Sequence, residues 1–328
     1  MRVWMTGGTG FVGSNIVRAA VRDGHDVSTT IHSFQPVGTH SYSMQQVDMA
    51  NERDVLASID IVRPDVLIHC AVLNDLAVLY ADRRRGWETY VSSTRIIAKA
   101  AERAQIPMVL VSTDWVFDGT QTGADEDTPP NPVNIYGFLK AASEVVALEH
   151  GAAVARVSGV NGLHYARPQT PRLQDPGFGY FVASLVDALR AGLPFTVWTD
   201  PNINMVATPS LASDCADSIL QIAVERATGV FHCCGADAVG RVELAHAACR
   251  VFGLDESLIR TGPPVWGDGH RYPVPYDSSI TAPRTERILR RPALSLGQLL
   301  DRFRNEYDDF TADAADAAHT DPSPGGST

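Results

Sequence analysis

A tyrosine and a lysine, Tyr136 and Lys140, lie four residues apart in a stretch with helical character. On a helix, this spacing puts both side chains on one face about one turn apart, so they can act on the same bound molecule. A free phenol titrates near pH ~10, and a neighbouring ammonium stabilises the phenolate that remains after proton donation. The pair therefore predicts a proton donor, Tyr136, tuned by Lys140, whose ammonium can also bind a ribose.

The use of lysine in this chain argues against a chance pairing on the surface. Lysine and arginine together number 27, and only two of them are lysines, Lys99 and Lys140. Arginine therefore supplies nearly every ordinary positive charge. A compact ammonium with a tunable pKa stands where a tyrosine precedes it by one helical turn.

Two hydroxyl residues, Ser112 and Thr113, end the strand that comes before this helix. Ligands of open α/β sheets bind at the carboxyl edge of the strands. We assign Thr113 to orienting a substrate carbonyl and Ser112 to a structural role. Asp114 and Asp118 either contact the substrate or cap the loop, and capping is the safer interpretation.

Glycines at positions 7, 10 and 13 directly follow the first strand and open the first helix. Gly7 permits a tight turn, Gly10 lets the backbone approach a pyrophosphate, and Gly13 lets helix and strand pack closely. The helix N-terminus adds free N–H groups and a partial positive charge. Turns are often rich in glycine, but this position in a β-turn-α series favours a dinucleotide site.

The segment after the second strand bears on the choice of cofactor. Val27–Gly38 contains no acid, and Ile31 stands where NAD-binding folds carry a carboxylate for the ribose hydroxyls. His32 and Ser33 could donate to a 2′-phosphate, although no arginine lies in this window. We therefore expect NADP(H) to be preferred, with NAD(H) left open. Asp48 either reaches the adenine amine or caps a helix.

The expected cofactor contacts come from the glycine turn, the ends of the next strands and the tyrosine-lysine pair. They are Gly7, Gly10, Phe11, Val12, Gly13, His32, Ser33, Asp48, Ala71, Tyr136 and Lys140.

The elements that must position these residues alternate between strand and helix. Strands are expected at 3–5, 26–31, 66–70, 108–112 and 153–157, and helices at 14–22, 52–61, 87–105 and 135–150. This alternation predicts an α/β fold, a Rossmann-type doubly wound parallel sheet with a smaller C-terminal substrate-binding domain.

Domain boundaries follow from where the alternation loosens. We expect an NAD(P)-binding domain over 1–160, with 205–235 returning to it, and a substrate-binding domain over 161–204 and 236–310. Residues 311–328 are mostly Ala, Asp, Ser, Pro and Gly, so a disordered tail is expected there.

Composition excludes several classes of protein. A net charge of -11 argues against a nucleic-acid partner. Five cysteines without a CxxC pair indicate reduced thiols and no metal site. No apolar run approaches the ~20 residues of a membrane span, and the glycine loop begins too early for a signal peptide. We expect a cytoplasmic protein with a small-molecule substrate, and a homodimer is left open.

The motifs together resemble a known family. The glycine turn, the run Ser-Thr-Asp-Trp-Val-Phe-Asp-Gly at 112–119 and the Tyr136–Lys140 segment are similar, in this order, to the extended short-chain dehydrogenase/reductases. Within them, the likeness is greatest to the dTDP-4-dehydrorhamnose reductase branch, and it runs over most of residues 1–310. It implies that Thr113, Tyr136 and Lys140 are catalytic, and that residues after Gly159 enclose a nucleotide-linked sugar.

Three positions depart from that family. Gly159 stands where an aromatic residue is usual, Trp115 where tyrosine is common, and Tyr90 where an asparagine supports the active site. The departures leave the cofactor and proton chemistry in place and concern the substrate. A glycine at 159 is expected to enlarge or reshape the pocket beside the sugar.

These observations predict an NADPH-dependent reductase of a keto group on a nucleotide-activated deoxysugar. The alternatives are an epimerase or dehydratase that returns the hydride, a non-catalytic NADP-binding regulatory subunit, and a reductase of a ketone without a sugar. Five arginines could meet a diphosphate through bidentate contacts: Arg156, Arg167, Arg172, Arg271 and Arg284.

Overall fold

The computed structural model of the chain describes residues 1–31, 34–36, 40–73, 75–167, 173–265 and 272–320. His32 and Ser33, expected at the cofactor ribose, lie outside this part of the chain, and so do Arg172 and Arg271.

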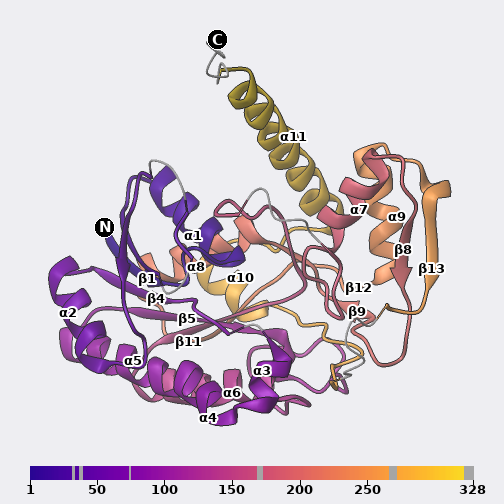
Figure 1. Ribbon diagram of the computed structural model, residues 1–328. Coiled ribbons are helices and arrows are strands. Elements are labelled where there is room, and N and C mark those ends of the chain that lie inside the picture. Colours follow the sequence, from indigo (N-terminus) through magenta and orange to yellow (C-terminus); the bar gives the residue numbers. More distant parts are fainter. Residues whose placement is uncertain (32–33, 37–39, 74, 168–172, 266–271, 321–328) are drawn as a thin grey trace.

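A seven-stranded parallel sheet forms the centre of the fold (Figure 1). Its order is β11-β6-β5-β4-β1-β2-β3, so the direction of winding reverses between β1 and β4, which is where ligands of such sheets bind. The strands are β1 (Arg2–Thr6), β2 (Asp26–Ile31), β3 (Ser43–Gln46), β4 (Val66–His69), β5 (Met108–Thr113), β6 (Ala153–Val157) and β11 (Gly229–Cys233). The expected Rossmann-type doubly wound fold is confirmed.

Helices cover both faces of this sheet (Figure 1). On one face, α1 (Phe11–Arg22) and α8 (Ala212–Val224) share a core with the strands. On the other face pack α2 (Glu52–Val62), α5 (Ser93–Ala104) and α6 (Ile135–Glu149). Each sheet face is covered, so strands such as β4 and β5 are buried along their whole length and are mostly apolar.

The connection from β4 to α5 contains more structure than the sequence predicted. Two short helices, α3 (Leu76–Ala81) and α4 (Arg83–Trp87), precede a single π-helical turn at Glu88–Ser92. The carboxylates of Asp75 and Asp82 cap the two short helices by accepting backbone N–H groups. The prediction of a single helix over 87–105 was therefore wrong at its start, because a π turn separates α4 from α5.

A second core lies beside the sheet, and its residues come from the later part of the chain. It is built from α7 (Phe181–Arg190), α9 (Arg241–Phe252) and the first half of α11 (Leu296–Thr320). Three two-stranded ladders accompany it: β7 (Val160–Asn161) with β10 (Ser210–Leu211), β8 (Phe195–Trp198) with β13 (Ile259–Gly262), and β9 (Val206–Ala207) with β12 (Val239–Gly240). The short α10 (Pro283–Leu289) lies against β11.

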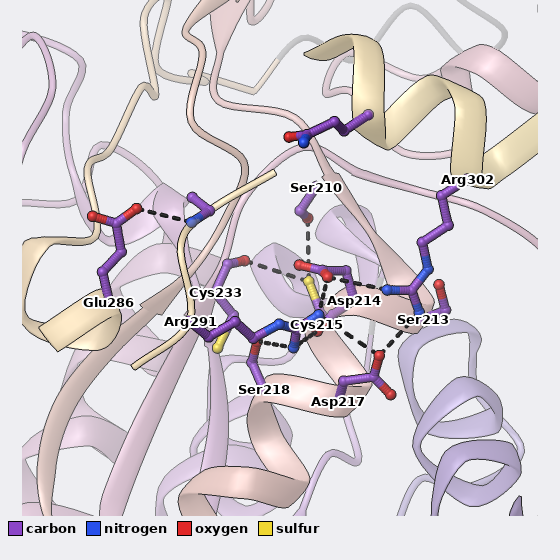
Figure 2. A network of polar contacts seen from close by, with 12 residues as sticks. Ser210, Ser213, Asp214, Cys215, Asp217, Ser218, Cys233, Glu286, Arg291 and Arg302 are labelled. Carbon is purple, nitrogen blue, oxygen red and sulfur yellow. Dashed lines mark hydrogen bonds and ion pairs between the residues drawn. The ribbon is translucent and has the colours of Figure 1, made fainter. Parts of the chain in front are cut away.

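A polar network fastens α11 to α8 (Figure 2). Arg302 on α11 donates to Asp214 at 3.2 Å and to Asp217 at 3.0 Å, both on α8. Arg291 donates to the same Asp214 carboxylate and, at 3.1 Å, to Ser218. Several charges that share partners hold their geometry better than isolated surface pairs do. The network therefore links the C-terminal segment to a helix of the central sheet.

The last helix corrects an expectation about the tail. α11 continues to Thr320, so residues 311–320 are helical in the structure, whereas disorder was expected from Thr311. Alanine, a strong helix former, is frequent in this stretch and lets the preceding helix propagate. Residues 321–328 lie outside the described residues.

We expect a chain that ends at Phe310 to keep the melting temperature of the full chain. Residues 311 and 312 are exposed, while the buried anchors of α11, Phe303 and Tyr307, are only 0% and 9% exposed. A chain that ends at Arg302 is the control, because it also loses Phe303, whose removal from a core costs about 3–5 kcal/mol. Thermal denaturation of both truncations decides the point. A clear fall for the shorter deletion would mean that the helix end docks on the protein.

No helix within the described ranges combines the length and the apolar character that crossing a lipid bilayer requires.

Candidate active site

A cleft of about 670 Å³ opens at the carboxyl ends of β1, β4 and β5, beside the reversal of strand order. This volume lies within the range of small-molecule sites. The structure brings most of the predicted site residues together along its walls: Gly7, Gly10, Phe11, Val12, Gly13, Thr113, Tyr136 and Lys140.

The glycine turn is shaped as a dinucleotide site requires. Gly7 has a φ of +72°, and a Cβ there would lie 2.6 Å from the backbone nitrogen of Ala71. A Cβ on Gly13 would lie 2.0 Å from the Gly7 carbonyl oxygen. No side chain fits at either position, so the start of α1 and the ends of β1 and β4 can approach closely. The helix starts at Phe11 rather than at the expected 14, because the turn passes directly into it.

Two other residues that were predicted to contact the cofactor, Ala71 and Asp48, lie near the glycine turn or after β3. Ala71 follows β4, and its N–H donates to the Thr6 hydroxyl at 3.0 Å, which fixes the strand end next to Gly7. The Asp48 carboxylate accepts the N–H of Ala50 at 2.9 Å, while Asn51 caps α2. Neither Ala71 nor Asp48 is among the described residues that line the cleft. Asp48 thus stabilises a turn and is not the helix cap considered above.

Lys140 is buried, with a side chain only 3% exposed, and its ammonium donates to the Val111 carbonyl at 2.8 Å. Burial lowers the pKa of Lys140 to about 8, and the neighbouring Cys70 and Glu144 oppose that shift. In the described part of the chain, no hydrogen bond joins this ammonium to the Tyr136 phenol. Its influence on Tyr136 would therefore act through space or through a ligand.

The Tyr136 ring stands between two other aromatic rings. Tyr90 and Trp115 each meet it edge to face, with ring centroids 6.1 Å away in both cases. Burial raises the pKa of Tyr136 above its ordinary value, and a hydrogen bond with Thr113 partly offsets this rise. The phenol is thus protonated at neutral pH and aligned with a hydroxyl at the end of β5. This is the state that a proton donor needs.

Comparisons with known proteins agree with this geometry. Residues 1–265 match the family described as the RmlD substrate binding domain. The chain belongs to this family. It is 30% identical over 264 residues to a probable low-salt glycan biosynthesis reductase, Agl14, of Haloferax volcanii, covering 80% of this chain and 83% of that protein. The expected membership of the extended short-chain dehydrogenase/reductases, in the dTDP-4-dehydrorhamnose reductase branch, is confirmed.

Two further proteins are similar to this chain. The beta subunit of methionine adenosyltransferase 2 from Bos taurus is 27% identical over 280 residues, which cover 81% of this chain and 77% of that protein. A dTDP-4-dehydrorhamnose reductase from Bacillus anthracis, solved in complex with NADP, shares the fold with a TM-score of 0.73 at 20% identity, covering 93% and 99% of the two chains.

At Tyr90, one of the positions expected to depart from the family, an aromatic side chain packs against Tyr136 and Lys140. Tyr90 lies in the π turn and is 2% exposed, and its hydroxyl donates to the Leu73 carbonyl at 2.9 Å. The Lys140 ammonium sits 5.5 Å from the centroid of its ring, within the range of a cation–π contact. π turns frequently occur at functional sites. Tyr90 therefore helps to hold both Tyr136 and Lys140.

At the second departure, Gly159, the expected enlarged pocket is wrong. Gly159 has a φ of +48°, and a Cβ there would lie 3.2 Å from the Cα of Pro209 and 3.4 Å from the Cβ of Phe178. The position is therefore crowded rather than hollow, and Gly159 is not among the described residues that line the cleft. Glycine serves the left-handed backbone at this point.

Several polar residues in and near the cleft wall have structural partners. The Asp114 carboxylate accepts hydrogen bonds from the hydroxyls of Thr113, Ser158 and Ser278 at 3.1, 2.9 and 2.7 Å. Burial raises the pKa of Asp114 to about 6 although these bonds oppose the shift. Ser112 donates to the buried Glu144, as expected for a structural residue. Asp118 caps its loop by accepting the N–H of Thr120 at 2.8 Å.

The three candidate arginines that the structure describes do not converge on the cleft. Arg156 is buried in a bidentate pair with Glu144, at 2.7 Å for its shortest contact, and Arg284 pairs with Asp127. Only Arg167 of the five lines the cleft within the described residues.

Sequence reasoning missed the wall of the cleft that is formed by residues within 164–167 and 175–180. This wall contains His164, Asp175, Gly177, Phe178 and Tyr180. Arg241, which is 0% exposed, supports it from behind by donating to the backbone carbonyls of Asp175 at 2.7 Å and Asn204 at 2.8 Å. The glycine- and proline-rich sequence at 176–179 indicated a loop near a ligand but could not show what braces it.

Proposed function

We propose that this chain is an NADPH-dependent reductase that converts a keto group on a nucleotide-activated deoxysugar to an alcohol. The observation that carries the proposal is the meeting of Tyr136, Thr113 and Lys140 beside the glycine turn in one cleft. Membership of the RmlD substrate-binding family and the 30% identity to a probable reductase support the reductive direction.

The residues present fit a nicotinamide dinucleotide. Gly7 and Gly13 leave room where a Cβ would collide with backbone, and α1 directs its N-terminus at the space above them. Lys140, buried beside this turn, can donate to a ribose hydroxyl. The bound cofactor would supply a hydride to the substrate carbon.

The remaining chemistry falls to the side chains of the chain itself. Thr113, at the end of β5, would orient the substrate carbonyl with its hydroxyl, and Tyr136 would protonate the oxygen as it gains charge. The buried ammonium of Lys140 would stabilise the phenolate that Tyr136 leaves. The Thr113 hydroxyl donates to Asp114 at 3.1 Å in this structure and would turn its proton to the carbonyl oxygen when the substrate binds.

A non-catalytic subunit is the second candidate, because the chain is 27% identical to the beta subunit of methionine adenosyltransferase 2. The half-buried Tyr136, its hydrogen bond with Thr113 and the buried Lys140 speak against it, since a binding subunit does not need a tuned phenol. An epimerase or dehydratase would use the same residues but return the hydride to the product. A tightly retained cofactor without net NADPH consumption would identify that class.

We expect NADPH oxidation with 4-keto nucleotide-sugars and none with simple ketones that lack the nucleotide. The reason is that the cleft continues from the catalytic residues to a second wall that includes Arg167 and the 175–180 loop, leaving room for more than a small ketone. The measurement is the loss of absorbance of NADPH against a panel of both substrate types. If only the simple ketones were turned over, a nucleotide-sugar would be excluded as the substrate, whereas the reductase activity would still be supported.

A further inference from the structure

A second cavity, of about 680 Å³, adjoins the glycine turn and is as large as the active-site cleft. Described residues from three parts of the chain line it: the outer side of α1, positions 34, 36 and 40–42 after β2, and residues 165–167 after β7. Gly8 of the glycine turn borders this cavity, and Arg167 lines both the cavity and the cleft. The cavity is therefore a neighbour of the cofactor site and not an isolated surface hollow.

Two guanidinium groups face this cavity, and each rests on an aromatic ring. Arg18 lies 4.3 Å from the centroid of the Tyr165 ring, and Arg167 lies 4.0 Å from that of Phe34. Stacking of this kind holds a guanidinium plane in place while its N–H edges stay available. These two stacking contacts therefore restrict both guanidinium groups at the cavity and leave their N–H groups able to donate.

Neither guanidinium forms an ion pair within the described part of the chain. In the ranges that the structure describes, no carboxylate lies within ion-pair distance of Arg18 or Arg167, and none lines the cavity. Many other arginines of the chain are paired, for example Arg22 with Asp217 at 2.9 Å and Arg190 with Asp308 at 2.7 Å. Two unpaired guanidiniums at one cavity favour an anionic group, above all a phosphate, which they can hold by bidentate bonds.

The position of the cavity indicates which phosphate this is. In folds of this type, the adenine ribose is recognised at the end of the second strand. The described residues closest after β2 are Phe34, Gln35 and Pro36, which carry no charge, and the ring of His40 already bonds the Pro36 carbonyl at 3.3 Å. A phosphate on that ribose would find its positive partners on α1 and after β7.

We propose that Arg18 and Arg167 bind the 2′-phosphate that distinguishes NADP from NAD, from outside the segment that usually performs this recognition. The inference rests on the proposed function in that it requires a nicotinamide dinucleotide at the glycine turn. It explains how a chain without an arginine between Val27 and Gly38 can prefer NADPH.

The test measures binding rather than activity. Isothermal titration of the full chain with 2′,5′-ADP and with 5′-ADP isolates the 2′-phosphate from the rest of the cofactor. We expect the wild-type chain to bind 2′,5′-ADP roughly a hundredfold more tightly, and Arg18→Gln and Arg167→Gln each to reduce that ratio about tenfold, as the loss of one charge-assisted contact implies. The affinity for 5′-ADP should stay within about twofold. Arg18→Lys and Arg167→Lys should recover part of the ratio.

Arg95→Gln is the matched control, because Arg95 is also an exposed helical arginine but lies on α5, on the other face of the sheet. It should leave the ratio unchanged. Equal binding of both nucleotides by the wild-type chain, or an unchanged ratio in both arginine variants, would overturn the inference. So would an Arg167→Gln variant that loses affinity for UDP or dTDP but not for 2′,5′-ADP, since Arg167 would then serve a substrate diphosphate. Absence of binding by 5′-ADP and NAD alike would count against the proposed function itself.

Discussion

Replacing Tyr136 by phenylalanine should lower turnover by roughly 10²-fold or more while the affinity for NADPH hardly changes, because only the proton donor is lost. The edge-to-face contacts of the ring with Tyr90 and Trp115 do not involve the hydroxyl and should persist. Steady-state kinetics with a 4-keto nucleotide-sugar, together with a cofactor titration, measures both quantities.

Tyr80→Phe is the control for this change, because it also removes a tyrosine hydroxyl. The Tyr80 ring stacks on that of Tyr272, with 4.6 Å between the ring centroids, and Tyr80 is not among the described residues that line the cleft. It should keep wild-type turnover. Near wild-type turnover in Tyr136→Phe would refute the role of the phenol, whereas a joint loss of turnover and cofactor affinity would point to a displaced α6.

The parallel sheet could be predicted because its signals are local. Each strand is a short apolar run between turn residues, and each helix has its own apolar face, so β2 (Asp26–Ile31) and β6 (Ala153–Val157) have the bounds that the sequence indicated. The π turn around Tyr90 could not be predicted, because it depends on how α4, α5 and α6 pack together. The helical extension to Thr320 shows that composition alone is a weak guide where a preceding helix can propagate. The proposed domain boundaries stay predictions, as do a homodimer and a cytoplasmic location.

The wall that carries the proposed catalytic residues could be predicted from the sequence, because these residues stand at fixed spacings on single elements. The glycine turn and the Tyr136–Lys140 pair are examples. The wall formed by residues within 164–167 and 175–180 could not be predicted, because it depends on contacts between distant segments. Arg241 on α9 bonds the backbone at Asp175, and Arg18 stacks on Tyr165, across separations that no local pattern encodes. For the same reason, Arg156 was offered as a diphosphate ligand although Glu144 neutralises it in the interior.

Lys140→Met should abolish most of the turnover, by about 10²-fold, without lowering the melting temperature at pH 7. The ammonium is taken out of water, and burial lowers its pKa to about 8. Its one hydrogen bond in the described structure, to Val111, is worth about 1 kcal/mol, less than the cost of burying a charge. Methionine fills similar space without that cost, so we expect an equal or higher melting temperature. Lys140→Arg should also be inactive, because it keeps the charge but not the shape.

The pH dependence of the melting temperature shows whether the effect of Lys140→Met comes from the buried charge or from packing alone. Below pH 8, Lys140 is protonated in both the folded and the unfolded chain, so the full cost of the buried charge is present. Between about pH 8 and ~10.4, the unfolded chain binds more protons than the folded one, and the stability of the wild-type chain therefore rises with pH relative to that of Lys140→Met. The advantage of the variant should be largest at pH 7 and should shrink towards pH 10. Melting curves at both pH values check this against Lys99→Met, which replaces the exposed lysine of α5 and should show no such trend. Lys140→Met could instead be less stable than wild type by the same amount at both pH values. Lys140 would then stabilise the fold through packing, and its buried charge would not lower the stability of the wild-type chain.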